Sequence, residues 1–230
     1  MALGSEQRNY LKKQSEMVKR MQRRSYQDLN KVARKGQILF TGSSLMEQFP
    51  INEIAMSMGV DKIIYNRGIC GTTTDEFLEH IDTVLLDLAP SKVFINIGTN
   101  DINPRSDGEY WQDHLLKNYG KILTILKEKL PETEVYMMAY YPVNPDIPDA
   151  PERIKLVFQF RTNAAIDDTN AKLAALAEKT GCHFIDCNAG LRDGKGNQKA
   201  EFSKEGLHMY PAAYLEVFKV LRPYLQSGKI

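Results

Sequence analysis

The apolar residues of this chain follow two patterns, short continuous runs and longer stretches with helical spacing. Five short runs are rich in β-branched and aromatic residues and are bounded by Gly, Pro or polar turn residues, which is typical of buried strands. The five runs are Gln37–Thr41, Lys62–Asn66, Lys92–Ile97, Glu134–Tyr140 and Cys182–Asp186. The third run is almost continuously apolar, as a central parallel strand is when both of its faces are covered.

Between the runs, apolar residues recur three or four positions apart, which predicts amphipathic helices. The predicted helices cover 6–35, Ile51–Met58, Thr74–Leu88, Tyr110–Leu130, Glu152–Lys179 and Pro211–Leu225. Strands that alternate with helices are typical of the α/β class. We therefore expect a three-layer α/β/α sandwich around a five-stranded, doubly wound parallel sheet with right-handed crossovers.

The chain has 230 residues, of which 43% are hydrophobic and 26% charged, and this composition fits an ordinary soluble domain. A net charge of +1 provides no overall field that would favour nucleic acid. Residues 1–35, however, carry ten Lys and Arg against three Asp and Glu. We expect them to form a basic N-terminal helical extension packed on a domain of residues 36–230. The alternative is a basic arm that binds an anionic surface or a partner subunit.

The cysteine content and the hydropathy of the chain indicate the expected cellular location. Cys70, Cys182 and Cys187 form no C-x-x-C pair and show no zinc-type spacing, so they are interpreted as free thiols in a reducing environment. Residues 1–5 lead into polar residues and not into the apolar region of a signal peptide, and no stretch approaches about 18 apolar residues, the length of a membrane span. We expect a cytoplasmic protein with no integral membrane association, no metal and no cofactor.

The turn after the first predicted strand carries the first candidate for chemistry. Gly42-Ser43-Ser44 ends that strand, and helical spacing resumes directly after it. In an open parallel sheet, ligands bind at the carboxyl ends of the strands, where a helix N-terminus offers free N–H groups. A serine here is a candidate nucleophile if a base can reach it. It is also the ordinary N-cap of a helix.

Three further blocks hold complementary groups. Asn66–Thr73 contains Gly71 and follows the second strand, Ile97–Asp101 contains Asn100 and follows the third, and Glu205–His208 lies near the C-terminus. A histidine suits proton transfer because its ordinary pKa of about 6.5 lies near neutrality. Taken from the residues alone, Gly71 could serve only a turn, Asn100 could form an Asx-turn or cap, and Glu205 could be an exposed side chain.

Together these four blocks resemble those of the SGNH, or GDSL, hydrolases, in the same order and at similar separations. The resemblance extends from about Gln37 to about Tyr214. It implies a flavodoxin-like parallel sheet and a serine esterase or lipase that works through an acyl-enzyme. In that interpretation Ser44 is the nucleophile, His208 the base and Glu205 the residue that orients the base.

The resemblance also implies an oxyanion hole formed by the backbone N–H groups of Ser44 and Gly71 and the side-chain amide of Asn100. Two residues depart from the family pattern. Ser43 stands where the family usually has Asp, and we expect this to affect the rigidity of the turn. Glu205 also replaces an Asp, and its extra methylene has to be accommodated by the backbone.

The implied substrates are small O-acyl esters, such as an acetylated carbohydrate or a lipid. Tyr140, Tyr141, Val143 and Asn144 follow the fourth strand and are predicted to wall the substrate pocket. A homo-oligomer is left open by the sequence. The nearby Asp101 is predicted to support its loop or to cap a helix.

Two other interpretations come from different classes. The departures at Ser43 and Glu205 would fit a non-catalytic binding or scaffold protein that keeps the fold. A nucleotide or phospho-acceptor domain would need a phosphate loop or an acidic cluster after the first strand, and serines stand there instead. A cation site formed by Asp186 and Asp193 with Glu205 is disfavoured, because the spacing matches no calcium loop.

Overall fold

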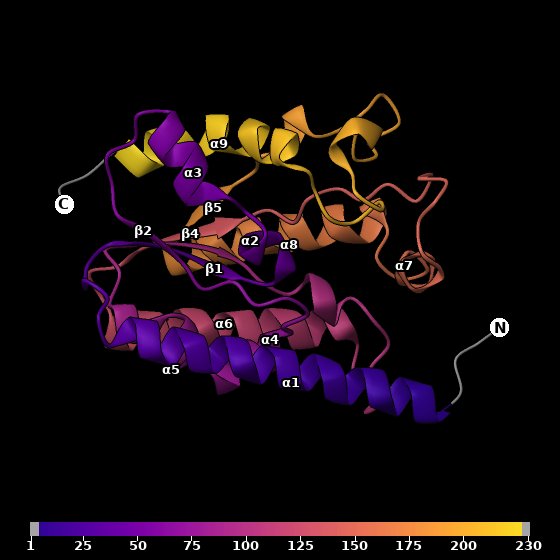
Figure 1. The fold of residues 1–230 in the computed structure, drawn as a ribbon, viewed down its shortest axis with the longest axis horizontal. Coiled ribbons are helices and arrows are strands. Elements are labelled where there is room, and N and C mark those ends of the chain that lie inside the picture. Colours follow the sequence, from indigo (N-terminus) through magenta and orange to yellow (C-terminus); the bar gives the residue numbers. More distant parts are fainter. Residues whose placement is uncertain (1–4, 227–230) are drawn as a thin grey trace.

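The structure is a computed structural model that describes residues 5–226. Its centre is a five-stranded sheet with the strand order β2-β1-β3-β4-β5, in which all neighbouring strands run parallel. The strands are β1 (Ile38–Gly42), β2 (Ile64–Asn66), β3 (Lys92–Asn96), β4 (Glu134–Met138) and β5 (His183–Ile185). Each predicted run forms one of them, and helices lie on both sides of the sheet (Figure 1). The predicted three-layer α/β/α fold is therefore confirmed.

The helices divide between the two faces of the sheet. Their bounds are α1 (Ser5–Asn30), α2 (Ser44–Glu47), α3 (Ile51–Ser57), α4 (Thr74–Glu79), α5 (Ile81–Val84), α6 (Trp111–Lys129), α7 (Glu152–Val157), α8 (Asn163–Thr180) and α9 (Pro211–Gln226). Apolar residues of α2, α3 and α9 share one core with the sheet. Those of α4, α5, α6 and α8 form the other core. Helix α1 lies against this second layer, where it contacts α5 and contributes Tyr26 to the same core (Figure 1).

The alternation of side chains along the strands supplies both cores. In β1, Leu39 packs into the α6 and α8 core, while its neighbour Phe40 packs into the α3 and α9 core. On that second face, an aromatic ladder crosses the sheet from Phe40 to Phe94, Tyr136 and His183, with ring centroids 4.7, 4.7 and 4.6 Å apart. Such cross-strand pairs hold the strands in register.

Two predicted helices are interrupted. The single helix expected over Glu152–Lys179 is wrong, because α7 ends at Val157 and α8 begins at Asn163. Thr162 is the N-cap of α8, with its hydroxyl accepting the backbone N–H of Ala165. The helix expected over Thr74–Leu88 is also broken, into α4, α5 and the short 3-10 helix η1 (Leu86–Leu88). In both cases the apolar spacing continues across the break, so periodicity alone could not reveal it.

Candidate active site

The turn after β1 presents Ser44 at the carboxyl edge of the sheet. A Cβ atom at Gly42 would lie 2.0 Å from the carbonyl oxygen of Asn96 in the neighbouring β3, and the φ angle of Gly42 is +147°. Only glycine therefore fits where β1 passes β3 into the turn. Ser44 begins α2, and 8% of its surface is exposed. The nucleophile candidate thus stands on a short helix N-terminus beside two strand ends.

Ser43 holds this turn through its backbone. Its N–H donates to the carbonyl of Asn96 at 3.2 Å, and its own carbonyl accepts the N–H groups of Met46 and Glu47 at 3.0 and 2.9 Å. Its hydroxyl is buried without a hydrogen-bond partner and caps nothing. The turn is therefore shaped without help from the side chain that replaces the family's Asp.

Ser44, His208 and Glu205 lie in one hydrogen-bonded line. Nε2 of His208 is 2.9 Å from Oγ of Ser44, although 164 positions separate the two residues. On the other side of the ring, Nδ1 contacts the carboxylate of Glu205. A carboxylate only accepts, so Nδ1 carries the proton and Nε2 is left to accept from the serine hydroxyl. This is the order of groups that activates a serine toward a carbonyl.

A tight turn between Ser203 and Met209 sets the distance between Glu205 and His208. These two end residues form an isolated antiparallel bridge, and the N–H of Gly206 donates to Oγ of Ser203 at 2.6 Å. Gly206 has φ of +93°, and a Cβ atom there would lie 2.2 Å from the carbonyl oxygen of Asn144. Glycine is thus required at the turn. The turn thereby brings the carboxylate of Glu205 into contact with the ring of His208, three positions later in the sequence.

Burial and the histidine act in opposite directions on Glu205. Burial raises the pKa of its carboxyl, whereas the hydrogen bond and charge of His208 lower it by more, so that the pKa lies below its ordinary value. The side chains of His208 and Glu205 remain 20% and 17% exposed. The glutamate is therefore held ionised against the ring, as an orienting carboxylate has to be.

Three candidate oxyanion donors lie in the segments that follow β1, β2 and β3, at Ser44, Gly71 and Asn100. No hydrogen-bond acceptor within residues 5–226 pairs with the backbone N–H of Ser44 or that of Gly71. The φ angle of Gly71 is +73°. Asn100, in the 3-10 helix η2 (Thr99–Asp101), donates one N–H of its amide to the carbonyl of Thr72 at 3.0 Å. The Asn100 amide is thereby bonded next to Gly71, as two donors of one oxyanion hole have to be.

A buried arginine that sequence reasoning missed stands behind Asn100. Nη2 of Arg161 donates to Oδ1 of Asn100 at 3.2 Å. Arg161 lies in the break between α7 and α8, and 4% of its surface is exposed. The N-cap signal at Thr162 could have indicated this break. No local pattern connects it with Asn100, 61 positions earlier.

Helix α1 contacts the loop that carries Gly71. The hydroxyl of Tyr26 donates to the carbonyl of Gly68 at 2.8 Å. The ammonium group of Lys19 binds both carboxylate oxygens of Glu76 at 2.7 and 2.9 Å, and Glu76 in turn accepts the backbone N–H of Thr73 at 3.0 Å. The loop is therefore held from outside by α1. Sequence reasoning treated these α1 residues only as part of a basic extension.

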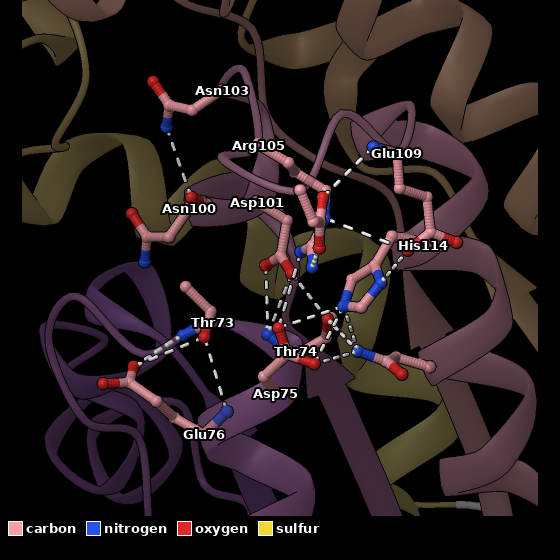
Figure 2. A network of polar contacts seen from close by, with 12 residues as sticks. Thr73, Thr74, Asp75, Glu76, Asn100, Asp101, Asn103, Arg105, Glu109 and His114 are labelled. Atoms are coloured by element: carbon pink, nitrogen blue, oxygen red, sulfur yellow. Dashed lines mark hydrogen bonds and ion pairs between the residues drawn. The ribbon is translucent and has the colours of Figure 1, made fainter.

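Asp101 supports the same region from inside (Figure 2). Its carboxylate accepts the backbone N–H of Thr74 at 3.0 Å and its hydroxyl at 2.5 Å. Burial raises the pKa of Asp101 to about 6, against the bonds from Thr74 that lower it. Asp101 thus ties η2, which carries Asn100, to the first turn of α4. His114 of α6 joins α4 in the same network by binding Asp75 at 2.8 Å and Glu109 at 2.7 Å.

The side chains predicted to wall a substrate pocket lie in the protein interior. Tyr140, Tyr141, Val143 and Asn144 are each 0–4% exposed. The hydroxyl of Tyr140 donates to the carbonyl of Ile97 at 2.6 Å, and the amide of Asn144 donates to that of Gln198 at 2.7 Å. These side chains are therefore packed against protein groups and expose little surface.

Two features are absent from residues 5–226, the part of the chain that the structure describes. No group of three or more His, Cys, Asp or Glu side chains there is arranged to hold a metal ion. Within the same residues, no helix is long and apolar enough to cross a membrane.

The chain matches the GDSL-like lipase/acylhydrolase family over residues 52–215. This match covers more than half of the chain, which therefore belongs to that family. The match begins after Ser44 and therefore does not include that serine. Together, the fold and the family define an ester hydrolase. A search of curated proteins finds no match.

Three solved structures illustrate the relationship. A candidate platelet activating factor from Streptococcus pneumonia is 29% identical, with a TM-score of 0.84 over 97% of this chain and 100% of that chain. A GDSL-like lipase from Bacteroides thetaiotaomicron is 21% identical, with a TM-score of 0.71 over 89% of this chain and 97% of that one. An acetylxylan esterase from Geobacillus stearothermophilus is 14% identical, with a TM-score of 0.63 over 85% and 96%. The latter two share the fold.

Proposed function

We propose that this protein is a serine esterase that removes short acyl groups from small O-acyl esters. The observation that carries the proposal is the Ser44–His208–Glu205 line, with 2.9 Å between the serine hydroxyl and the imidazole. A chance contact between a serine and a histidine would not include a carboxylate on the opposite ring nitrogen and free N–H groups beside the serine.

In the first half of the reaction, Oγ of Ser44 attacks the ester carbonyl while Nε2 of His208 takes the hydroxyl proton. The N–H groups of Ser44, Gly71 and Asn100 bind the oxyanion that develops on the carbonyl oxygen. The carbon–oxygen bond of the ester then breaks, and His208 returns the proton to the leaving alcohol. An acyl group remains on Ser44.

In the second half, His208 removes a proton from a water molecule that attacks the acyl group. The same donors stabilise the second oxyanion. The bond between the acyl carbon and Oγ of Ser44 then breaks, His208 returns the proton to Oγ, and the acid leaves. Throughout, Glu205 keeps the ring oriented and stabilises its positive charge. No other reactant is required, since water supplies both the hydroxyl and the proton.

We further propose acetyl esters of carbohydrates as the substrate class. The support is a shared fold with an enzyme named as an acetylxylan esterase. A panel of acetylated sugars and of p-nitrophenyl esters with increasing chain length tests this part. The proposal predicts that the specificity constant falls as the acyl chain lengthens.

Hydrolysis of p-nitrophenyl acetate by Ser44→Ala, compared with wild type, tests the reaction itself. The matched control is Ser43→Ala, the neighbouring serine whose hydroxyl bonds nothing. Ser44→Ala should lose at least about 10⁴-fold in kcat, while Ser43→Ala keeps nearly all of it. Equal slow hydrolysis by the wild type and Ser44→Ala would instead favour the non-catalytic binding protein.

A further inference from the structure

Arg161 is buried at a position where a cation with a purely structural role would destabilise the fold. It is 4% exposed, its Nε is sealed from solvent without a partner, and it forms no ion pair with a carboxylate among residues 5–226. Burial lowers the pKa of its guanidinium to about 10, although Asp101 acts to raise it. A buried cation without a direct counter-ion destabilises the fold relative to an apolar side chain. Such a cost suggests that the charge serves the site.

Among residues 5–226, the side chain of Arg161 makes one hydrogen bond, and this bond determines how the Asn100 amide is oriented. A guanidinium only donates, so the amide oxygen has to face it. The Thr72 carbonyl only accepts, so the amide nitrogen has to face that side. A flipped amide would set donor against donor and acceptor against acceptor. The arrangement therefore leaves the second N–H of Asn100, and not its oxygen, available to the substrate.

The positive charge of Arg161 also affects the donor strength of the Asn100 amide, in addition to fixing its orientation. A bond from a guanidinium is charge-assisted and draws electron density toward the amide oxygen, which makes the N–H groups better donors. A fixed positive charge in a buried position polarises the amide more strongly than a solvated charge would. Both effects are larger in the transition state than in the bound ester, because negative charge appears only there.

We propose that Arg161 is a positioning residue of the oxyanion hole, holding the Asn100 amide with its N–H toward the ester carbonyl and placing a positive charge behind it. This inference rests on the proposed esterase function. Arg161 itself does not touch the substrate in this scheme. Its effect is transmitted through Asn100 and is therefore expected in kcat and not in KM.

Steady-state kinetics on p-nitrophenyl acetate with Arg161→Met, Arg161→Lys and Asn100→Ala, and with the double variant R161M/N100A, test the inference. Arg161→Met should lower kcat about 10- to 100-fold with KM changed less than about threefold. Arg161→Lys, which keeps the charge, should retain more kcat than Arg161→Met. The double variant should be no slower than Asn100→Ala alone by more than about threefold, because Arg161 acts through Asn100.

Arg222→Met, an exposed arginine on α9, is the matched control and should keep wild-type kcat. Thermal unfolding of each variant shows that it is folded, and if Arg161→Met does not fold, the cycle is repeated with Arg161→Lys. Wild-type kcat in a folded Arg161→Met or Arg161→Lys variant, a loss confined to KM, or a multiplicative loss in the double variant would overturn the inference. Full activity of Ser44→Ala would instead overturn the proposed function.

Discussion

Lys19 of α1 binds both carboxylate oxygens of Glu76, the residue that completes the capping box of α4. The same lysine lies against Gly71, since a Cβ atom built there would be 3.4 Å from its Cε. A basic helix that the family match does not include thus contacts the loop predicted to stabilise the oxyanion. The buried face of α1 is consequently part of the support of the site.

Replacement of Lys19 by methionine is expected to lower the free energy of unfolding by roughly 2–3 kcal/mol at neutral pH. The lysine side chain is 8% exposed and the glutamate side chain 23%, so the loss leaves a half-buried carboxylate without its cation. Urea unfolding measures the change. Lys13→Met, on an exposed position of the same helix, should have almost no effect.

The effect of Lys19→Met should depend on pH. Burial raises the pKa of Glu76, but Lys19 and the Thr73 N–H lower it to below its ordinary 4.5 in the folded state. A depressed pKa contributes stability that is present above 4.5 and is lost as the pH falls through the folded value. The difference between wild type and variant should therefore shrink in acid. An equal difference at about pH 7 and about pH 3.5 would contradict the ion-pair explanation.

Asp101 is expected to give the opposite pH dependence. Its folded pKa of about 6 lies above the ordinary 3.8, so the folded protein holds this proton more tightly than the unfolded chain. Stability from this group is therefore full below 3.8 and declines as the pH rises to about 6. At about 1.4 kcal/mol per unit, the decline is of the order of 3 kcal/mol.

Asp101→Asn should remove this decline, because an amide is neutral at every pH and still offers an oxygen to Thr74. Urea unfolding of wild type and Asp101→Asn between about pH 4 and 7 measures how the free energy of unfolding changes with pH. The exposed Asp113→Asn on α6 is the control and should leave the decline unchanged. Parallel pH curves for wild type and Asp101→Asn would show that Asp101 is not the group responsible.

Ser43→Ala is expected to leave stability unchanged or to raise it by up to about 1 kcal/mol. The hydroxyl is buried and bonds nothing, so its removal relieves the cost of an unsatisfied polar group. Thermal unfolding provides the measurement, with Ser203→Ala as the contrast, because Oγ of Ser203 accepts the N–H of Gly206. Strong destabilisation by Ser43→Ala would mean that this hydroxyl does shape the turn.

The strands and the candidate site residues could be predicted because both are indicated by short stretches of local sequence. The apolar character of the run from Lys92 to Ile97 was sufficient to predict β3. The carboxyl ends of parallel strands lie at the same edge of the sheet, which brings the segments after them together. The contact between Ser44 and His208 follows from that topology once the blocks are recognised.

Other features of the site depend on contacts between distant segments. A lysine on a basic helix is ordinarily solvated, so nothing near Lys19 indicates its burial against Glu76. Arg161 reaches Asn100 only because the helix predicted over Glu152–Lys179 is broken before Thr162. The burial of the side chains predicted to wall a pocket at Tyr140 could not be predicted for a related reason. The fourth strand was predicted, although β4 ends at Met138 and not at Tyr140, and the direction of the segment after it was not encoded locally.

The glutamate in place of the family's aspartate provides the sharpest test of the triad. Glu205→Gln keeps the size of the side chain and removes its charge, so the imidazolium loses its stabilising partner. We expect kcat to fall by about 10³–10⁴. Glu205→Asp keeps the charge one methylene farther from Nδ1 and should lose less. Kinetics with p-nitrophenyl acetate measure both, and the exposed Glu201→Gln is the matched control.

The pH profile separates this role from a structural one. Because the pKa of Glu205 lies below its ordinary 4.5, the carboxylate stays ionised at every higher pH. The loss in Glu205→Gln should therefore be similar from about pH 7.5 to about pH 9, at unchanged thermal stability. If Glu205→Gln kept wild-type kcat while Ser44→Ala and His208→Ala lost it, a serine–histidine pair would suffice and Glu205 would have no orienting role.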